Sequence, residues 1–338
     1  MQAGLSATAS TSAPTFGEII HRHAAESGDA IALRYLDRIT TYAELDAISN
    51  RIANALLAHA RPGDRIAYLG KNSDMAVALV IGVAKAGMVL VPIIWRLASG
   101  EVDYILEDST AQILFLDPDL TPVAKALTVL PERVVQIEGE LTEPSWTTFE
   151  RFIAEAAPAR PSIEVCADDA LLQIYTSGTT GRPKGAVLSH ANATRYRQVI
   201  DAAGLDWLQS APGETALLAM PFGHIAGAGQ ALLILHARGE MIIHREFDPG
   251  ALLDAIEVHR LRRLFLVPAA LQLLLAHPRA GSADFSSLRY FSYGASPIPV
   301  PLLEAGMARL GCQFIQVYGM TETWGGVVAL PPEDHDPD

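Results

Sequence analysis

The stretch from Tyr175 to Gly185, YTSGTTGRPKG, gathers hydroxyl, glycine and basic side chains between two apolar runs. The glycines let the backbone adopt positive φ and approach a ligand closely, so that consecutive N–H groups can point at one anion. Arg182 and Lys184 contribute positive charge. The remaining polar and flexible positions are Thr176, Ser177, Gly178, Thr179, Thr180 and Gly181. This combination of residues is suited to holding a polyphosphate.

Two common phosphate-binding motifs do not match this stretch. A P-loop needs Gly-Lys-Ser/Thr at the start of a helix, whereas Lys184 follows Pro183 and precedes Gly185. The dinucleotide fingerprint GxGxxG is also absent. The chain is therefore not a standard P-loop NTPase or Rossmann dehydrogenase. Taken by itself, the stretch leaves a glycine-rich hairpin turn open as the alternative.

Three further motifs follow in order: MPFGH (220–224), SYGASPIP (292–299) and YGMTET (318–323). With the loop at 175–185, they resemble the signature segments of the adenylate-forming superfamily, which includes acyl-CoA synthetases, luciferases and peptide-synthetase adenylation domains. The resemblance covers nearly the whole chain. It implies an acyl-CoA synthetase type of protein that couples a carboxylic acid to ATP, giving an acyl-adenylate and pyrophosphate, and then transfers the acyl group to a thiol such as coenzyme A.

The resemblance also implies roles for individual residues. The loop from Thr176 to Lys184 would enclose the β- and γ-phosphates, and Glu322 with the Thr176 hydroxyl would hold Mg²⁺, which prefers hard oxygen ligands. Thr321 would donate to the α-phosphate. The implied catalytic residues are Thr321, Glu322 and His224. Tyr318 would stack on adenine opposite Gly294, Ala295 and Ser296, with Gly319 and Met320 completing the ATP-binding set.

His224 is expected at the carboxylate-binding end of an acyl pocket, with Gly223, Gly227, Gly294 and Gly319 as further acyl-binding residues. Small side chains surround this histidine in MPFGHIAGAG, so the pocket wall is expected to be open. This favours a medium or long fatty acid or a bulky ring acid. An amino-acid-activating domain is a less favoured alternative, because MPFGHIAGAG lacks an aspartate to pair with a substrate amine.

Composition narrows the possible partners. With 25 Lys and Arg against 38 Asp and Glu, the chain has a net charge of −13, which argues against a general affinity for nucleic acid or anionic lipid. Cys166 and Cys312 form no metal-ligand cluster. A cytoplasmic setting is the default expectation, since the N-terminus lacks the pattern of a secretory signal. The apolar segment 75–94 contains Lys85, Gly87 and Pro92 and predicts a core helix and strand, not a transmembrane segment.

Apolar strand segments alternate with helical segments along the chain and predict an α/β fold, with layered, largely parallel sheets flanked by helices. The expected strands are 31–35, 65–70, 88–93, 112–117, 133–138, 171–175, 185–189, 215–220, 240–244, 264–267 and 289–294. The expected helices are 42–59, 75–87, 99–107, 146–155, 225–237, 249–259 and 268–276, with one more after a cap at Ser189 or Asn192.

Prolines and small residues at 156–165 suggest a seam between two subdomains, although a surface connection is equally compatible. The expected organisation is a disordered lead-in at 1–14, an α/β subdomain at 15–160, a second with the ATP-binding motifs at 161–330, and an acidic tail at 331–338. After Thr323 nothing matches the family's Tyr-x-Thr-Gly-Asp segment or its small C-terminal lid domain, so a truncated large domain is expected. The parent protein is then an acid–CoA ligase, while the chain itself binds nucleotide with very slow adenylation, or is a binding module without turnover. The oligomeric state is not readable.

Overall fold

The structure of the chain is a computed structural model that describes residues 13–177 and 181–335. Within these residues the strands form three sheets. The largest has the order β7-β6-β5-β3-β4-β8-β9. Its strands are β3 (Arg65–Leu69), β4 (Val89–Ile93), β5 (Ile113–Leu116), β6 (Arg133–Gln136), β7 (Thr147–Thr148), β8 (Ala170–Thr176) and β9 (Lys184–Ser189). All neighbours are parallel except β8 and β9, which form an antiparallel hairpin.

The other two sheets have four strands each and the orders β10-β11-β1-β2 and β12-β13-β14-β15. The first contains β1 (Ile31–Tyr35), β2 (Arg38–Thr41), β10 (Thr215–Leu218) and β11 (Glu240–Ile243). The second contains β12 (Arg263–Leu266), β13 (Tyr290–Gly294), β14 (Gln313–Met320) and β15 (Gly325–Leu330). Each sheet is parallel apart from one antiparallel edge pair, β1 with β2 and β14 with β15.

Helices cover these sheets, and several begin at residues that cap them. The Thr15, Thr41, Ser73 and Ser189 side chains each accept a hydrogen bond from a backbone N–H in the first turn of the following helix. The helices are α1 (Phe16–Ser27), α2 (Tyr42–Leu57), α3 (Asp74–Lys85), α4 (Ser99–Ser109), α5 (Thr121–Lys125), α6 (Phe149–Ile153), α7 (His190–Ala202), α8 (Ile225–His236), α9 (Pro249–His259), α10 (Pro268–Ala276) and α11 (Val300–Leu310).

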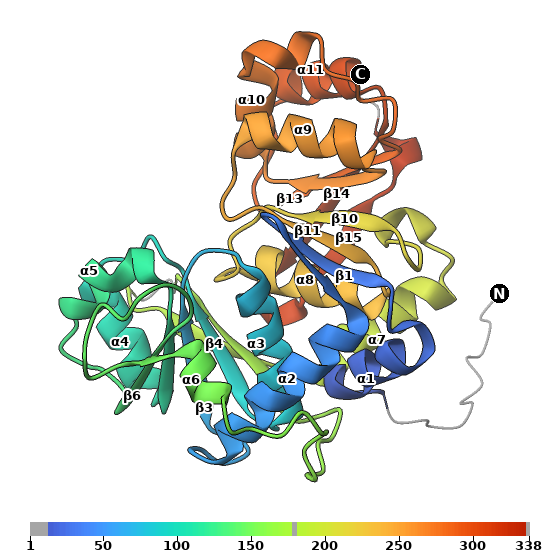
Figure 1. Cartoon of the computed structure of the whole chain (residues 1–338). Coiled ribbons are helices and arrows are strands. Elements are labelled where there is room, and N and C mark those ends of the chain that lie inside the picture. Colours follow the sequence, from blue (N-terminus) through green and yellow to red (C-terminus); the bar gives the residue numbers. More distant parts are fainter. Residues whose placement is uncertain (1–12, 178–180, 336–338) are drawn as a thin grey trace.

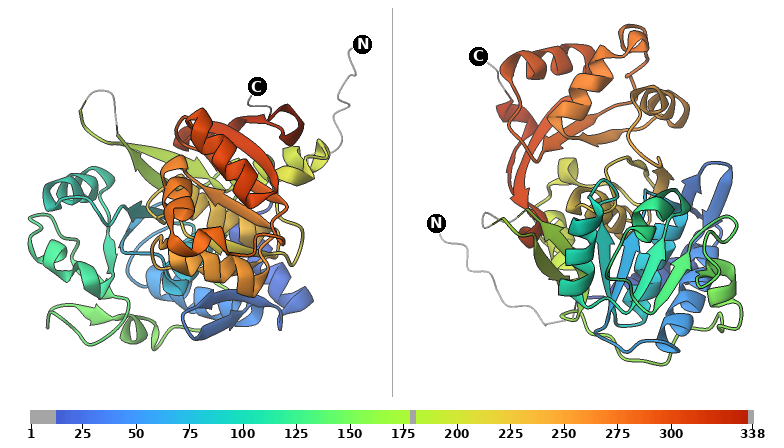
Figure 2. Two further views of the ribbon diagram at one scale, coloured as in Figure 1. Left: turned by 90° about the horizontal axis from the view of Figure 1, so that it is seen from above. Right: turned by 90° about the vertical axis from the view of Figure 1, so that its left-hand side faces the viewer.

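The helices form layers on and between the sheets. One apolar core joins α1, α2, α3 and α8 with inward-facing residues of the two lower sheets, which are the seven-stranded sheet and the β10-β11-β1-β2 sheet. A second core packs α4 on the opposite face of the seven-stranded sheet. A third core joins α9, α10 and α11 to the β12–β15 sheet, which forms the upper lobe in Figure 1 and in the right view of Figure 2. The expected layered α/β fold is confirmed.

The apolar segment 75–94 is confirmed as a core helix followed by a strand. Helix α3 is buried along nearly its whole length because it lies between α1, α2 and β4. The Lys85 ammonium is 1% exposed and donates to Asp46 Oδ1 at 2.6 Å and Asn50 Oδ1 at 2.7 Å. Across the described parts of the chain, every helix is too short or too polar to cross a bilayer.

The two lower sheets are tied together at the ends of their strands. Asn72, which follows β3, is 1% exposed. Its Nδ2 donates to the carbonyl oxygens of Met220 at 3.1 Å and His244 at 3.0 Å, and its Oδ1 accepts from Phe222 N at 2.8 Å. Met220 and His244 lie just beyond β10 and β11. One amide side chain therefore fixes the end of the β10–β11 pair against the seven-stranded sheet.

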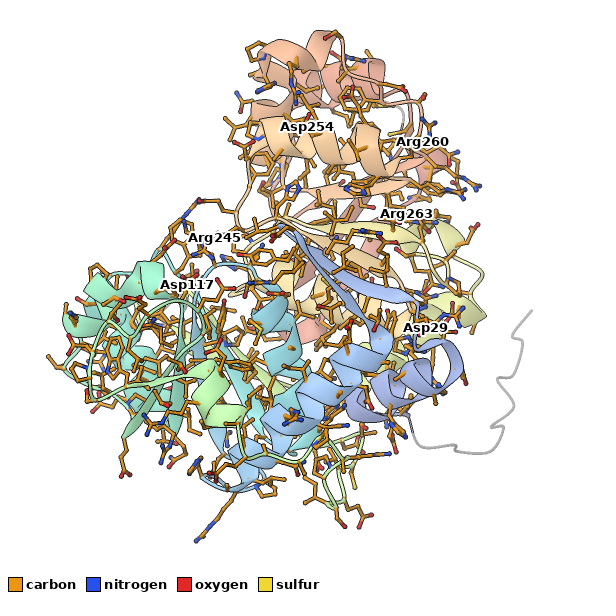
Figure 3. The ribbon with its side chains drawn as sticks, viewed as in Figure 1. Asp29, Asp117, Arg245, Asp254, Arg260 and Arg263 are labelled. Carbon is orange, nitrogen blue, oxygen red and sulfur yellow. The ribbon has the colours of Figure 1, made fainter. Side chains whose placement is uncertain are left out.

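A charged pair reinforces this junction. Arg245 Nη2 donates to Asp117 Oδ1 at 2.8 Å and to Asp119 Oδ2 at 2.7 Å, while Nη1 donates to the Tyr35 hydroxyl at 3.1 Å. Asp117 follows β5 and is fully buried. Figure 3 shows Arg245 and Asp117 facing each other where the two sheets meet. A buried carboxylate paired in this way holds its position because separating the pair would leave an uncompensated charge.

Helix α1 closes the lower lobe over buried histidines. Phe16 N donates to His190 Nδ1 at 3.2 Å, and the Phe16 ring lies 6.2 Å from the His190 ring and 6.3 Å from the His236 ring. Burial lowers the pKa of both His190 and His236 to about 4. Both rings are therefore neutral at pH 7.

Some elements differ from the expectations. The predicted helix at 146–155 divides into β7 and a shorter α6, because the extended residues Thr147 and Thr148 pair with β6. Helix α1, the β2 edge and α11 were not predicted. Strands from both sides of the seam expected near residue 160 share sheets, since β8 pairs with β4 and β1 pairs with β11. Because these sheets cross the seam, they mark no boundary there, and the expected division into two subdomains stays a prediction.

We expect Asn72→Ala to lower the free energy of unfolding by about 3 kcal/mol, because it leaves two buried carbonyls and one buried N–H without partners. Urea unfolding at pH 7 measures this change. Asn192→Ala, at an exposed helix cap, is the matched control and should cost roughly 1 kcal/mol or less. Equal effects of the two substitutions would contradict the role assigned to Asn72.

We also expect the protein to lose stability as the pH falls from 7 to 5. A histidine whose folded-state pKa lies below its unfolded value contributes stability that is complete above pH 6.5 and is lost as the pH falls toward 4. For one ring the loss between pH 7 and pH 5 is about 2 kcal/mol. Urea unfolding at both pH values should show a pH dependence smaller by that amount in His236→Gln, whereas Asn192→Ala, which removes no titratable group, should keep the wild-type pH dependence. An unchanged pH dependence in His236→Gln would rule out this contribution.

Candidate functional site

The predicted phosphate loop joins the two strands of the β8–β9 hairpin. Thr176 at the end of β8 is in register with Lys184 at the start of β9, so both residues lie at the base of the loop. Ser177, Arg182 and Lys184 are exposed. Gly181 adopts a φ of +88°, which is the positive φ expected for glycines of this loop. Three predicted ATP-binding residues, Gly178, Thr179 and Thr180, lie outside the described residues.

Side chains below the loop hold the hairpin on the sheet. The Tyr175 hydroxyl donates to Asp108 Oδ2 on α4 at 2.5 Å and accepts from Gln173 Nε2 at 3.0 Å. Gln173 Oε1 in turn accepts from Arg65 Nε at 3.1 Å. A Cβ at Gly185 would lie 2.7 Å from Gln173 Nε2, so the hairpin packs this closely only with glycine at that position. The loop is therefore anchored to α4 and β3.

The predicted catalytic residues Thr321 and Glu322 lie in a tight turn, η4 (Thr321–Thr323), directly after β14. Thr323 Oγ1 accepts from Met320 N at 3.1 Å and donates to Met320 O at 3.0 Å, which fixes the turn. This turn packs against β9, the return strand of the phosphate-loop hairpin. The fold thus brings together two motifs that are more than a hundred positions apart in sequence. Glu322 is exposed beside them.

The third motif follows β13, the neighbour of β14. Gly294 is in register with Val317, and a Cβ at Gly294 would lie 2.3 Å from the Val317 carbonyl oxygen. Ala295 adopts a φ of +67°, a conformation that costs a non-glycine residue about 1–2 kcal/mol. Ser296 is exposed, and Tyr318 on β14 is 66% exposed. The binding of adenine between Tyr318 and the segment Gly294–Ser296 remains a prediction. Ser296 and Tyr318 are both exposed and accessible to a ligand.

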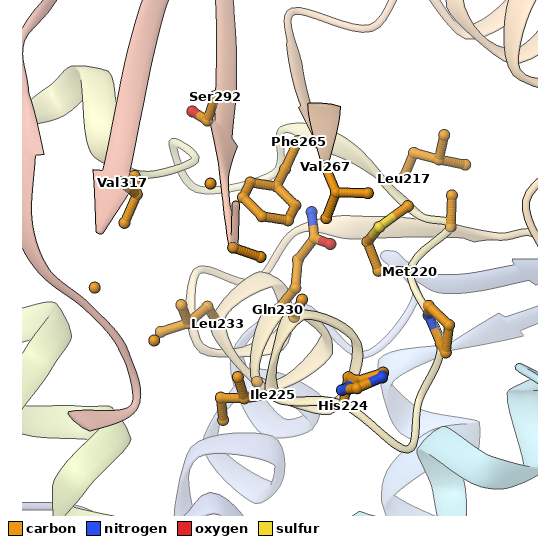
Figure 4. Close-up of a pocket in the computed structure, with 18 of the residues that line it drawn as sticks. Leu217, Met220, His224, Ile225, Gln230, Leu233, Phe265, Val267, Ser292 and Val317 are labelled. Atoms are coloured by element: carbon orange, nitrogen blue, oxygen red, sulfur yellow. The ribbon is translucent and has the colours of Figure 1, made fainter. Parts of the chain in front are cut away.

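A single cavity of about 790 Å³ collects predicted residues from three motifs. His224, Gly294, Ala295, Gly319, Met320 and Thr321 all line it. Most of the remaining lining is apolar, including Leu217, Met220, Ile225, Leu233, Phe265, Val267 and Val317, as Figure 4 shows. Thr176, Ser177, Gly181, Lys184, Ser296, Tyr318 and Glu322 lie outside this lining. The cavity is therefore mainly apolar, although polar side chains such as Arg197, Arg263 and Ser292 also line it.

His224 is the residue immediately before α8, and its side chain caps no backbone N–H. Its ring lines the cavity and the residue is exposed there, while partial desolvation by the surrounding protein lowers the pKa of the imidazole. A neutral imidazole can donate one N–H to a carboxylate while remaining uncharged. The geometry therefore permits His224 to orient an acid at the start of α8.

Gly223 and Gly227 do not line the cavity, and their expected acyl-binding role stays a prediction. A Cβ at Gly223 would lie 2.7 Å from Ile94 N, and one at Gly227 would lie 2.1 Å from Pro221 O. Close backbone packing accounts for both glycines. The small residues of this segment that do line the cavity are Ala226 and Gly229. They leave room for a ligand along the first turns of α8.

The donor set at the predicted Mg²⁺ site fits the ion, since Glu322 offers an exposed carboxylate and Thr176 a hydroxyl. Magnesium is commonly held by one or two protein oxygens together with substrate phosphates. Among residues 13–177 and 181–335 no cluster of three or more His, Cys, Asp or Glu side chains is arranged to hold a metal ion.

Most residues of the cavity lining were not predicted from the sequence as site residues, and Asn72, Gln230 and Trp324 are examples. The contacts of Asn72 to the ends of β10 and β11 depend on long-range packing, which no local sequence signal reveals. Gln230 shares a helical face with Ala226 and Leu233, so the periodicity of α8 was a signal that could have found it. Trp324 lies directly after the YGMTET motif and is 4% exposed.

Comparison with known proteins identifies the family of the chain. The model of the AMP-binding enzyme family matches residues 20–338. The chain is 40% identical over 301 residues to a fatty acid–[acyl-carrier-protein] ligase, ScoC, of Streptomyces coeruleorubidus, covering 89% of this chain and 57% of that protein. It is 40% identical over 313 residues to a feruloyl-CoA synthase of an Amycolatopsis species, covering 91% and 60%. The chain thus spans less than two thirds of the length of these relatives.

A solved structure extends the agreement to the fold. The inhibitor-bound N-terminal domain of FACL13 from Mycobacterium tuberculosis superposes with a TM-score of 0.82 at 29% identity, covering 95% of this chain and 79% of that one. The order of the four motifs, the three-sheet fold and the match over residues 20–338 all agree. The chain therefore belongs to the AMP-binding enzyme family, the adenylate-forming superfamily that its motifs resemble.

Proposed function

We propose that the protein activates a carboxylic acid with ATP to give an acyl-adenylate and pyrophosphate, and then transfers the acyl group to a thiol. The observation that carries this proposal is the cavity, because His224, Ala295 and Thr321 come from three separate motifs and line it together. The contact between the η4 turn, which carries Thr321 and Glu322, and β9, the return strand of the 175–185 hairpin, supports it.

At the nucleotide end, Lys184 and the loop hydroxyls would bind the β- and γ-phosphates, and Thr321 would donate to the α-phosphate. Glu322 and Thr176 would hold Mg²⁺, which supplies neutralisation of the phosphate charge. Tyr318, exposed on β14, would stack on adenine. Attack of a carboxylate on a polyanion is slow chiefly because of charge repulsion and orientation, so groups that position both reactants and offset charge are the ones the reaction needs.

At the acid end, neutral His224 would donate an N–H to the carboxylate and direct it toward the α-phosphorus. The remainder of the acid would extend along α8 into the apolar part of the cavity. A volume of about 790 Å³ exceeds what a two-carbon acid needs and supports a medium or long fatty acid or a bulky ring acid as substrate.

The thiol acceptor that we propose is coenzyme A. The printed names of the two relatives above divide between coenzyme A and an acyl carrier protein as acceptor. An acyl carrier protein is therefore the alternative acceptor. Thioester formation with each, from the same acid and ATP, distinguishes them.

Acid-dependent exchange of labelled pyrophosphate into ATP tests the proposed reaction. With the 338-residue chain we expect exchange with octanoate or a bulkier aryl acid to exceed exchange with acetate, because the small acid leaves most of the apolar cavity unfilled. A strong preference for acetate would contradict the proposed acid class. Binding of ATP and acid without exchange would indicate a binding module, and absence of ATP binding would contradict the proposal as a whole.

Replacing Lys184 by Ala should weaken ATP binding about tenfold or more while leaving acid binding nearly unchanged, since a hydrogen bond to a charged group contributes about 1.5–3 kcal/mol. Isothermal titration of Mg·ATP and, separately, of the acid measures both affinities. Lys125→Ala, which removes a half-exposed lysine paired with Glu143, is the matched control. An equal loss of ATP and acid binding in Lys184→Ala would point to a disturbed fold and count against the phosphate role.

A further inference from the structure

Gln230 places an amide inside the otherwise apolar part of the cavity. It lies on α8, on the face that also presents Ala226 and Leu233 to the cavity. In Figure 4 its side chain rises from the helix and its amide ends beside Phe265 and Val267. An apolar side chain would fill the same space without a desolvation cost, so the amide needs an explanation.

One atom of the Gln230 amide, Oε1, lacks a hydrogen-bond partner within the described part of the chain. This oxygen is buried. Leaving a buried polar atom unpaired costs about 1–3 kcal/mol, and native structures contain few such atoms. Fold stability does not account for this side chain, whereas a ligand group that pairs with the amide would.

A second polar group on the cavity wall is also unpartnered among these residues. The indole Nε1 of Trp324 is buried without an acceptor, and Trp324 is 4% exposed. The indole lies close to the residue that precedes Gln230, since a Cβ at Gly229 would be 3.9 Å from Trp324 Cε2. Polar atoms without partners therefore occur on two elements that face one cavity.

The position of Gln230 relative to His224 sets where a matching ligand group would lie. Gln230 is six positions beyond His224, which corresponds to about 9 Å along the helix axis. If the carboxylate lies at His224, the amide meets a part of the acid remote from its reacting end. An amide both donates and accepts, so it can pair with a hydroxyl or with a carbonyl oxygen.

We propose that Gln230 is a specificity-determining residue that selects acids with a hydroxyl or carbonyl group remote from the carboxylate. The inference rests on the proposed function, because it takes His224 as the carboxylate end. It narrows the substrate class from apolar acids in general to acids with an apolar body and a distal polar group. Plain hydrocarbon acids fit the cavity but leave the amide unpaired.

The test compares binding of two acids that differ by one distal hydroxyl, cinnamic acid and 4-hydroxycinnamic acid. Isothermal titration of the 338-residue chain should show at least about tenfold tighter binding of the hydroxylated acid, the ratio that corresponds to one buried hydrogen bond. In Gln230→Leu the preference should disappear through weaker binding of 4-hydroxycinnamic acid, with cinnamic acid bound as well as before or better. The melting temperature of this variant should be unchanged or higher, because the substitution removes a buried unpaired atom.

Gln313→Leu, at an exposed position at the start of β14, is the matched control and should keep the wild-type preference. Equal binding of the two acids by the wild type, or an unchanged preference in Gln230→Leu, would overturn the inference and leave the proposed function standing. If the wild type bound neither acid, the inference would be overturned, whereas the proposed function would still be decided by ATP binding and by pyrophosphate exchange with octanoate.

Discussion

The Asn72 side chain is the interaction on which the geometry of the cavity most depends. It connects the end of β3 to the ends of β10 and β11 through three hydrogen bonds, and the Arg245–Asp117 pair repeats the connection a few residues away. The segment carrying His224 leaves β10 at this point and leads into α8. Because a buried amide with all of its bonds made has one favourable orientation, the junction fixes where α8 begins and therefore where its cavity-facing side chains lie.

Close backbone contacts determine the opposite wall. Gly294 lies so near the Val317 carbonyl that a larger residue would separate β13 from β14, and a Cβ at Gly319 would overlap Gly325 O. Ala295 and Trp324 then take positive φ at the ends of these segments, although neither is a glycine. Strain of this kind persists only where surrounding structure compensates for it, and both residues border the cavity. The nucleotide-side wall is thus held in a conformation that these two residues would not adopt by preference.

The layered α/β fold could be predicted from the sequence. Apolar strand segments alternate with helical segments, and the four motifs resemble a family with that fold. Local signals also located α9 and α10, whose prolines stand in the first turn. Long-range packing was not predictable in the same way. Gly227 was expected to open the acyl pocket, but whether a glycine provides space or close contact depends on the backbone opposite to it, here Pro221.

The same limit explains why the sequence alone predicts only a broad class of acid substrates. Small residues after His224 suggested a large pocket, and this reasoning concerns volume alone. Specificity depends more on polar groups that only some ligands satisfy, because an unpaired buried amide discriminates more strongly than an extra methylene. Gln230 gives no sign of such a role in the sequence, where it is one polar residue in an apolar helix. Only the folded chain shows that its amide ends inside the cavity, six positions beyond His224, with Oε1 lacking a partner among the described residues.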